Sequence, residues 1–374
     1  MIHVRRVNED KQGLQDFISL PYRLYAGTPN WCPPFKPEQR LNFSLKNPFM
    51  RQAEVALFVA YLKDRPVARV SAHIDPAYND YHQVKQGFFG FFECEPECGI
   101  AQVLMSVAEN WLREQSIPSV MGPFNFSTNH GIGLLTDGFE HPPVLTMPYT
   151  HAGYPALLES IGYTKVKELV SYAIEQLDAI PDRLIRLATR AREKWDAEFR
   201  VERFDPERME LDMKTVGRLY NEAWSANWGY APISDEEMAH FTDSVKSFAE
   251  PDAVWSVMKG EEPVGFLMGL PDINEALIRI PNASWLPTGW WTLLNWKRHV
   301  KTCMVHALGM RPKYRNLGLE LLLFLRLYEL RRDWPQCKRL ETSWILEDNV
   351  PMRRLIEICG GEVIKRFAVY GKDL

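Results

Sequence analysis

The sequence has no excess of positive charge. Its 374 residues include 44 lysines and arginines against 48 aspartates and glutamates, which gives a formal net charge of −4. Proteins that coat nucleic acids depend on a large positive field. We therefore expect no nucleic-acid partner, although a local basic patch is compatible with this balance.

Long hydrophobic runs are also missing. The longest apolar stretch near a helix, LGLELLLFLRLYEL, is interrupted by Glu320, Arg326 and Glu329, whereas a helix that spans a bilayer needs about 20 apolar residues. The first residues, MIHVRRVNEDKQGLQDF, are polar and lack the apolar core of a signal peptide. These absences predict a cytoplasmic protein without stable membrane insertion.

Cysteine is scarce and scattered along the chain. Cys94 and Cys98 lie close together, but no second pair and no histidine cluster completes a set of metal ligands. We therefore expect reduced thiols and no metal. The sequence also lacks the G-x-x-x-x-G-K-[S/T] loop of nucleoside triphosphatases and the G-x-S-x-G elbow of many hydrolases.

What the sequence does contain is an internal repeat at a spacing of 197 or 198 residues. The matching landmarks are Asn30-Trp31 with Asn227-Trp228, Pro66 with Pro263, Gly162 with Gly360, and Tyr172 with Tyr370. Each proline of the second pair ends a charged turn between two apolar runs, which is typical of a β-hairpin. The constant spacing indicates two copies of one domain.

The repeat predicts how the chain is organised. We expect an N-terminal copy over residues 1–178, a linking helix over 179–205 and a C-terminal copy over 206–374. In each copy a hairpin is followed by alternating strands and helices. This pattern predicts an α/β fold of the α+β type, with a mixed β-sheet flanked by helices.

A basic loop precedes an apolar helix in the C-terminal copy. Arg311, Lys313 and Arg315 follow the predicted strand VKTCMVHALGM, and Gly318 stands at the start of the helix. Basic side chains at a helix N-terminus are unfavourable by about 0.3–1 kcal/mol each unless an anion binds there. Because the free N–H groups of the first turn also attract anions, the loop suits a pyrophosphate. The alternative is a solvated loop.

The stretch Arg315-Asn316-Leu317-Gly318-Leu319 resembles the [Q/R]-x-x-G-x-[G/A] signature of the GNAT superfamily of acyl-CoA-dependent N-acyltransferases, although Glu320 stands where that family has Gly or Ala. The resemblance implies two tandem GNAT-like domains, each with a partly splayed sheet. It also implies that acetyl-CoA or another acyl-CoA binds in the C-terminal copy. The residues expected to bind it are Met310, Arg311, Lys313, Arg315, Asn316, Leu317, Gly318, Leu319 and Asn349.

The N-terminal copy is expected to have lost this site. Glu93, Glu95 and Glu97 replace the basic residues at the matching helix start, where they would repel a pyrophosphate. A long loop follows, rich in Gly, Pro, Asn, Ser and Thr. Its Asn125 and Asn129 are candidates for an acceptor pocket, and a structural plug is the alternative.

Three residues are candidates for catalysis. His306 lies on the strand before the basic loop, and an imidazole with an unshifted pKa near ~6.5 suits a base at neutral pH. A histidine satisfied within the sheet is the alternative. Glu341 is a carboxylate on the next strand. The family's usual acid tyrosine is replaced by Ile356, so Tyr370 is the candidate substitute.

The resemblance places the acceptor beside the first helices of the C-terminal copy. The candidates there are Asn221, Trp224, Asn227, Trp228 and Tyr230, with core packing as the alternative for the tryptophans. A further insertion carries Trp285, Trp290, Trp291 and Trp296 beside basic residues. A lid, an acyl-chain tunnel and a dimer face are the interpretations of this insertion, with membrane contact less favoured.

Together these features predict an N-acyltransferase that moves an acyl group, with acetyl expected, from acyl-CoA to a small-molecule or peptide amine. Two alternatives stay open. One is a ligand-binding protein that keeps the fold without turnover, and the other is an aminoacyl transferase of the Fem type. A homodimer also stays open.

Overall fold

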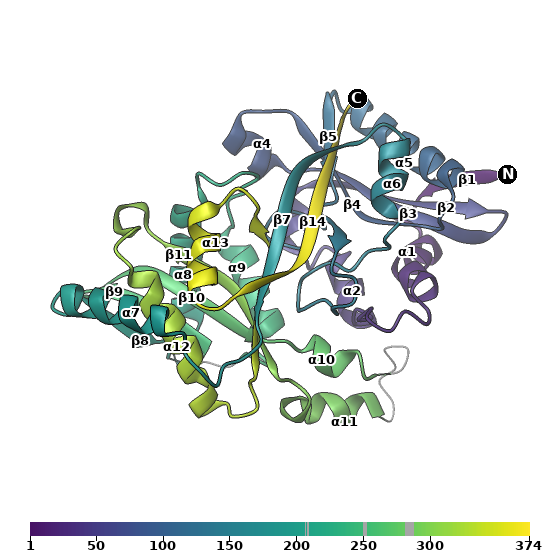
Figure 1. Cartoon of the computed structure of the whole chain (residues 1–374). Helices are drawn as coiled ribbons and strands as arrows, with labels where there is room; N and C mark the ends of the chain where they lie inside the picture. Colours follow the sequence, from purple (N-terminus) through teal and green to yellow (C-terminus); the bar gives the residue numbers. More distant parts are fainter. Residues whose placement is uncertain (206, 208, 250–252, 281–287) are drawn as a thin grey trace. The chain divides into compact units, whose positions relative to one another are not determined.

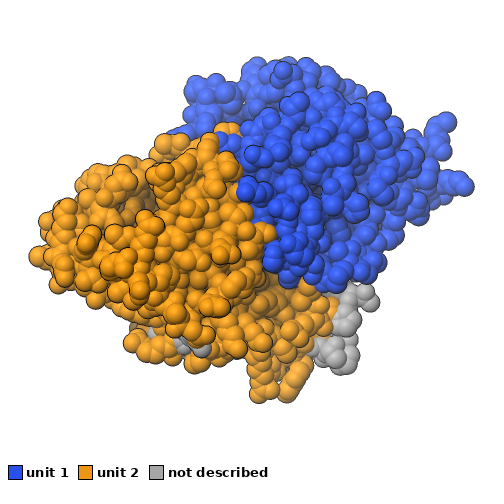
Figure 2. Space-filling view, in the orientation of Figure 1, with its two compact units in different colours: residues 1–169, 281–284, 365–374 blue, residues 170–280, 285–364 orange. Residues whose placement is uncertain are grey.

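The computed structural model describes residues 1–374 except 206, 208, 250–252 and 281–287 (Figure 1). Trp285 and the first residue of the predicted C-terminal copy, 206, therefore lie outside the described residues. The described residues form two compact units, coloured separately in Figure 2. Unit 1 takes Met1–Leu169 and Lys365–Leu374, and unit 2 takes Val170–Ile280 and residues 288–364.

Unit 1 is built around a mixed sheet. Its elements in chain order are β1 (Ile2–Arg6), α1 (Lys11–Leu24), α2 (Lys36–Asn42), α3 (Pro48–Gln52), β2 (Glu54–Leu62), β3 (Arg65–Ile74), α4 (Pro76–His82), β4 (Gln86–Cys94), α5 (Cys98–Glu114), β5 (Ser119–Gly122), β6 (Leu134–Asp137), α6 (Tyr154–Ser160) and the first half of β7 (Thr164–Ile174). The sheet order is β1-β2-β3-β4-β5, with β14 (Glu362–Asp373) beyond β5. Of the strand pairs in this order, β4 and β5 are parallel and the others are antiparallel.

Unit 2 repeats this order. Its further elements are α7 (Asp182–Trp195), β8 (Phe199–Arg203), α8 (Met209–Trp224), α9 (Asp235–Val245), β9 (Val254–Lys259), β10 (Glu262–Pro271), α10 (Asn274–Leu277), α11 (Thr288–Leu294), η4 (Trp296–Arg298), β11 (Thr302–Met310), η5 (Pro312–Tyr314), α12 (Leu319–Asp333), β12 (Arg339–Thr342), β13 (Ile345–Leu346) and α13 (Val350–Ile358). The sheet order is β8-β9-β10-β11-β12, with the end of β7 beyond β12. Here β11 and β12 are the parallel pair. The predicted fold class, a mixed sheet flanked by helices in two tandem copies, is confirmed.

The last strand of each copy pairs in the sheet of the other unit. Ala173 and Ile174 at the end of β7 pair with β12 in unit 2. Residues 370–373 of β14 pair with β5 in unit 1. Each sheet is therefore completed by a strand from the other half of the sequence, and the compact units divide the chain differently from the sequence repeat.

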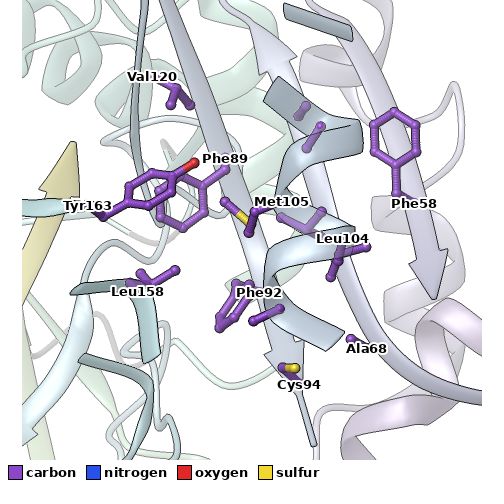
Figure 3. Packing of buried hydrophobic residues seen from close by; sticks show 14 of the residues in the cluster. Phe58, Ala68, Phe89, Phe92, Cys94, Leu104, Met105, Val120, Leu158 and Tyr163 are labelled. Carbon is purple, nitrogen blue, oxygen red and sulfur yellow. The ribbon is translucent and has the colours of Figure 1, made fainter. Parts of the chain in front are cut away.

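The two faces of the unit 1 sheet carry separate cores, because side chains alternate along a strand. On β2, Ala56, Phe58 and Ala60 pack in one cluster, which includes the buried face of α5. The alternate residues of β2 pack in a second cluster with Phe17 of α1. Figure 3 shows part of the first cluster, where Leu104 and Met105 of α5 lie over the sheet.

A buried polar cluster interrupts the apolar interior of unit 1. The Glu93 carboxylate accepts hydrogen bonds from the hydroxyls of Tyr25 and Tyr154, at 2.8 and 2.9 Å. The Arg69 guanidinium lies 4.0 Å from the same carboxylate. Burial raises the pKa of Glu93 to about 7, and the attraction of Arg69 and the two hydroxyls offset this only in part.

This pKa predicts how stability depends on pH. The folded state holds the Glu93 proton up to about pH 7, whereas the unfolded chain releases it near the ordinary glutamate pKa of 4.5. Unfolding therefore releases a proton between these values, and the free energy of unfolding falls as the pH rises through that window. In Glu93→Gln the decline should flatten. Melting temperatures measured at several pH values check this, and identical slopes for both proteins would contradict it.

Among the described helices, none is long and apolar enough to cross a membrane.

Candidate active site

The parallel strands β11 and β12 separate within unit 2. Their register runs from Thr302 opposite Arg339 to Val305 opposite Thr342. The Ser343 amide then donates to the Val305 carbonyl at 3.0 Å, and the Ser343 hydroxyl donates to the His306 carbonyl at 2.8 Å. In the described part of the chain the two strands pair no further, while β11 continues to Met310. Among the described strands, none therefore pairs with the edge of β11 beyond His306 on that side.

His306 stands at a β-bulge just where the strands separate. On the other side of β11, Val305 pairs with Gly269 and Ala307 pairs with Met268, so His306 is the extra residue. A bulge redirects a side chain and increases the local twist of the strand. The imidazole stacks on Phe241 of α9, with ring centres 5.0 Å apart. His306 therefore faces helix α9.

The environment of His306 sets its protonation state. Burial lowers its pKa to about 4, so the expectation of an unshifted pKa is wrong. Desolvation disfavours the charged imidazolium. Its Nδ1 is buried and has no hydrogen-bond partner among the described residues. A neutral imidazole with an unpaired nitrogen can accept a hydrogen bond from a polar group in this position, although its lowered pKa makes it a weaker base than a solvated histidine.

The loop between β11 and α12 gathers backbone N–H groups. It has eight residues, 311–318, of which Asn316 and Gly318 adopt left-handed conformations with φ of 62° and 82°. Gly318 is the N-cap of α12, and no side chain caps the helix there. Successive amides in such a turn, together with the free amides of a helix start, form a concave site for an anion.

The helix α7 supports this loop from behind. The indole N–H of Trp195 donates to the Leu317 carbonyl at 3.2 Å. A Cβ at Gly318 would lie 3.4 Å from the Cβ of Ala191. The segment predicted as a linker therefore belongs to unit 2 and helps to fix the loop, a role that its sequence did not indicate.

The three basic residues are placed differently from one another. Arg311 forms ion pairs with Glu222, at 2.9 Å, and with Glu262. Arg315 donates to the carbonyls of Met310, at 3.3 Å, and Ala223. Lys313 is exposed, with its ammonium 4.8 Å from the centre of the Tyr314 ring. Much of the predicted positive charge is thus engaged with protein oxygens, which leaves backbone amides as the main groups available to an anion.

Glu320 itself lies against the loop amides. Burial raises the pKa of its carboxyl, while the backbone amides of Glu320 and Asn316 and the charge of Arg315 oppose that rise. The sequence departs from the family signature at this position. As a result, a carboxylate lies beside the N–H groups of Asn316 and Glu320.

The acceptor candidates on α8 and the following loop divide into three groups. The Asn221 side chain accepts from the Tyr230 hydroxyl and the Ile233 amide, at 2.8 and 2.9 Å, and donates to the Ile233 carbonyl at 2.9 Å. Asn221 and Tyr230 therefore hold the loop between α8 and α9. Trp224 lies against β11, where a Cβ at Gly309 would come within 2.3 Å of its ring. Asn227 and Trp228 are half-buried in the turn after α8.

The remaining candidates have other partners. Glu341 is buried on β12, 3.1 Å from the Arg339 guanidinium. Asn349 caps α13 by accepting the Met352 amide at 3.3 Å. Tyr370 lies in unit 1, where its hydroxyl donates to Glu159 at 3.3 Å. Leu319 and Met310 are buried, and Met310 takes part through its carbonyl.

The matching region of unit 1 is closed. Only three residues, 95–97, connect β4 to α5, against eight in unit 2. Glu95 is paired with Arg65 and with Arg23, the latter at 2.7 Å. The Phe91 amide donates to the Asn125 side chain at 2.8 Å, and the Phe124 amide donates to the Phe89 carbonyl at 2.7 Å.

Asn125 thus fastens the loop after β5 to β4, which agrees with a structural plug. The Asn129 amide donates to the Ser127 hydroxyl at 3.2 Å within the same loop.

Sequence reasoning missed three residues that shape the site in unit 2. Ser343 fixes the point where the strands part, Phe241 holds the His306 ring, and Trp195 anchors the loop. A serine directly after a short strand carries no distinctive signal. Phe241 and Trp195 belong to amphipathic helices, in which aromatic residues are ordinarily read as core.

A sheet that parts beside an amide-lined loop is the arrangement of acyl-CoA-dependent acyltransferases, and comparison with known proteins agrees. The Acetyltransferase (GNAT) family matches residues 213–360. The chain belongs to this family, in a tandem arrangement, and is an acyltransferase.

Two relatives match nearly the whole chain. Protein YghO of Escherichia coli (strain K12) is 31% identical over 98% of this chain and 94% of its own length. The bacterial ceramide synthase of Caulobacter vibrioides is 32% identical over 96% of this chain and 95% of its own length. A solved tandem GNAT protein from the clavulanic acid biosynthesis pathway shares the fold, with a TM-score of 0.58 and 12% identity over 100% of this chain and 98% of that one.

Proposed function

We propose that this protein transfers an acyl group from acyl-CoA to the amino group of an acceptor, using the site in unit 2. The supporting observation is the juxtaposition on β11: its unpaired edge begins at the bulged His306 and ends at the amide-lined loop 311–318. Acyl transfer needs an anion site for the coenzyme, a polarised carbonyl and a group that takes the proton of the amine.

The residues present fit these tasks. The amides from Asn316 to Glu320 would hold the pyrophosphate, with Lys313 adding charge. The open edge of β11 offers backbone N–H groups to a thioester carbonyl. Coenzyme A supplies the activated thioester when bound. His306, neutral at pH 7, would take the proton of the attacking amine.

We infer the identity of the acyl donor and of the acceptor from the name of a relative, and not from the geometry of the site. A ceramide is an amide between a fatty acyl group and a long-chain amino alcohol. The relative named ceramide synthase therefore favours a long-chain acyl-CoA and a lipid amine over the acetyl group and the small-molecule or peptide amine suggested by the sequence.

A binding protein without turnover is the second candidate, because Glu341 and Tyr370 are engaged with Arg339 and Glu159. Calorimetric titration with acetyl-CoA and palmitoyl-CoA, followed by a mass-spectrometric search for amide product with a panel of amines, separates the two. Binding with product supports the proposal. Binding without product for every amine would favour the second candidate, and absence of binding would refute both.

Removing the competing carboxylate should strengthen binding. Glu320→Ala frees the amides of Asn316 and residue 320 and restores a residue of the family signature. We expect acyl-CoA to bind about tenfold more tightly, which corresponds to about 1.4 kcal/mol. Glu329→Ala, on the same helix and paired with Arg326, is the matched control. Equal or weaker binding by Glu320→Ala would show that the carboxylate does not compete.

A further inference from the structure

Helix α11 presents two large apolar side chains to solvent. Trp291 is 67% exposed and Leu294 is 69% exposed. Residues three apart lie on the same face of a helix, so the two side chains form one apolar strip. Figure 1 shows α11 beside α10 at the edge of unit 2. Since tryptophan is largely buried on average, this strip calls for an explanation.

The same segment carries a concentration of positive charge. Residues 274–301 hold four basic residues, Arg279, Lys297, Arg298 and Lys301, and one acidic residue, Glu275. The local net charge is thus three positive, in a chain with a net charge of −4. The Glu275 carboxylate is itself occupied, since it accepts the Thr302 hydroxyl at 2.8 Å and the amides of Thr302 and Lys301.

Apolar and basic side chains are held close together here. The amide and side chain of Asn295 donate to the Trp291 carbonyl at 3.1 and 2.9 Å, so η4 follows α11 without a gap. The Lys297 ammonium lies 5.6 Å from the centre of the Trp296 ring. Gln336 donates to the Lys297 carbonyl at 3.2 Å, which fixes η4 to the body of unit 2.

We propose that Trp291, Leu294, Trp296, Lys297 and Arg298, here called the α11 patch, dock unit 2 on the surface of an anionic phospholipid bilayer. Indole rings favour the boundary between headgroups and acyl chains, and basic residues add attraction to anionic lipids. A second copy of the chain is a poorer partner, because two-fold symmetry would bring two patches of the same charge together. The purpose of the patch, access to lipid substrates, rests on the proposed function.

Vesicle sedimentation tests the proposal with the full chain and without substrate. We expect binding to mixed phosphatidylcholine–phosphatidylglycerol vesicles, weaker binding to phosphatidylcholine alone, and a decline as salt is raised. Trp291→Ser with Leu294→Ser, and Lys297→Glu with Arg298→Glu, should each lower the partition coefficient by about tenfold or more. The matched control is Val84→Ser with Lys85→Glu, an exposed apolar and basic pair in unit 1, which should bind like the wild type.

Three outcomes would overturn the proposal: no binding to either vesicle, undiminished binding by both patch variants, or a wild-type dimer that Trp291→Ser with Leu294→Ser converts to a monomer in sedimentation velocity. The assay is independent of catalysis. A protein that binds vesicles but makes no amide from detergent-solubilised substrates refutes the proposed function alone. A protein that makes amide but ignores vesicles refutes the patch alone.

Discussion

Replacement of His306 by glutamine is expected to lower kcat for amide formation by about 10²–10⁴-fold, the usual contribution of a general base. Glutamine keeps a polar group of similar reach but cannot take a full proton from the amine. Because the loop 311–318 is untouched, the dissociation constant for acyl-CoA should change by less than about threefold. Steady-state kinetics together with calorimetry separate the two effects.

The low pKa of His306 sharpens this prediction. With a pKa of about 4, the imidazole is neutral throughout the range from pH 6 to pH 8. The pH–rate profile of the wild type should therefore show no ionisation of His306 in that range. The rate should rise with pH only as the amine acceptor loses its own proton. Phe241→Leu removes the ring that His306 stacks on and should cause a smaller loss of kcat. A fully active His306→Gln protein would remove His306 from the mechanism.

Replacement of Gly318 by aspartate is expected to weaken acyl-CoA binding at least about a hundredfold, or about 2.7 kcal/mol. The new carboxylate would stand at the start of α12, where it would take the free amides and repel a pyrophosphate. Aspartate is among the residues that tolerate a positive φ best, so we expect the variant to fold with the φ of 82° at this position. An acidic group at a helix N-terminus also stabilises the helix. Calorimetric titration with acyl-CoA measures the loss.

Gly99→Asp is the matched control for this change. Gly99 is the counterpart of Gly318 in the N-terminal copy, it lies in the first turn of α5, and a Cβ there would meet no atom within 4 Å. We expect full acyl-CoA affinity in this variant, because the short connection of three residues before α5 has no counterpart of the loop. If Gly99→Asp weakened binding as much as Gly318→Asp, the assignment of the coenzyme site to unit 2 would be wrong.

Much of the fold could be predicted from local patterns. The hairpins around Pro66 and Pro263 and the strand, loop and helix around Gly318 are local features, so propensity and spacing suffice to indicate them. The loss of the loop in the N-terminal copy is visible for the same reason, since Glu95 and Glu97 stand where a pyrophosphate would need positive charge.

The candidate site depended on contacts between residues far apart in the sequence. The bulge at His306 arises because the register between β10 and β11 shifts between Met268 and Gly269. The low pKa of the imidazole follows from burial, which no local pattern reports. The side chain of Arg315, which the sequence predicts as a ligand for an anion, donates to the Ala223 carbonyl, 92 positions away.

Two copies of one domain, and an anion loop in the second copy, could be predicted from the sequence, because repeat spacing and charge are local properties of the chain. The exchange of last strands, by which β7 pairs with β12 and β14 pairs with β5, is visible only in the folded chain, and it places Tyr370 in unit 1 with Glu159. Strand pairing depends on which sheet edges come together when the whole chain folds. The equivalent strands β7 and β14 have nearly the same pattern of apolar residues, so the sequence does not indicate which sheet each one joins.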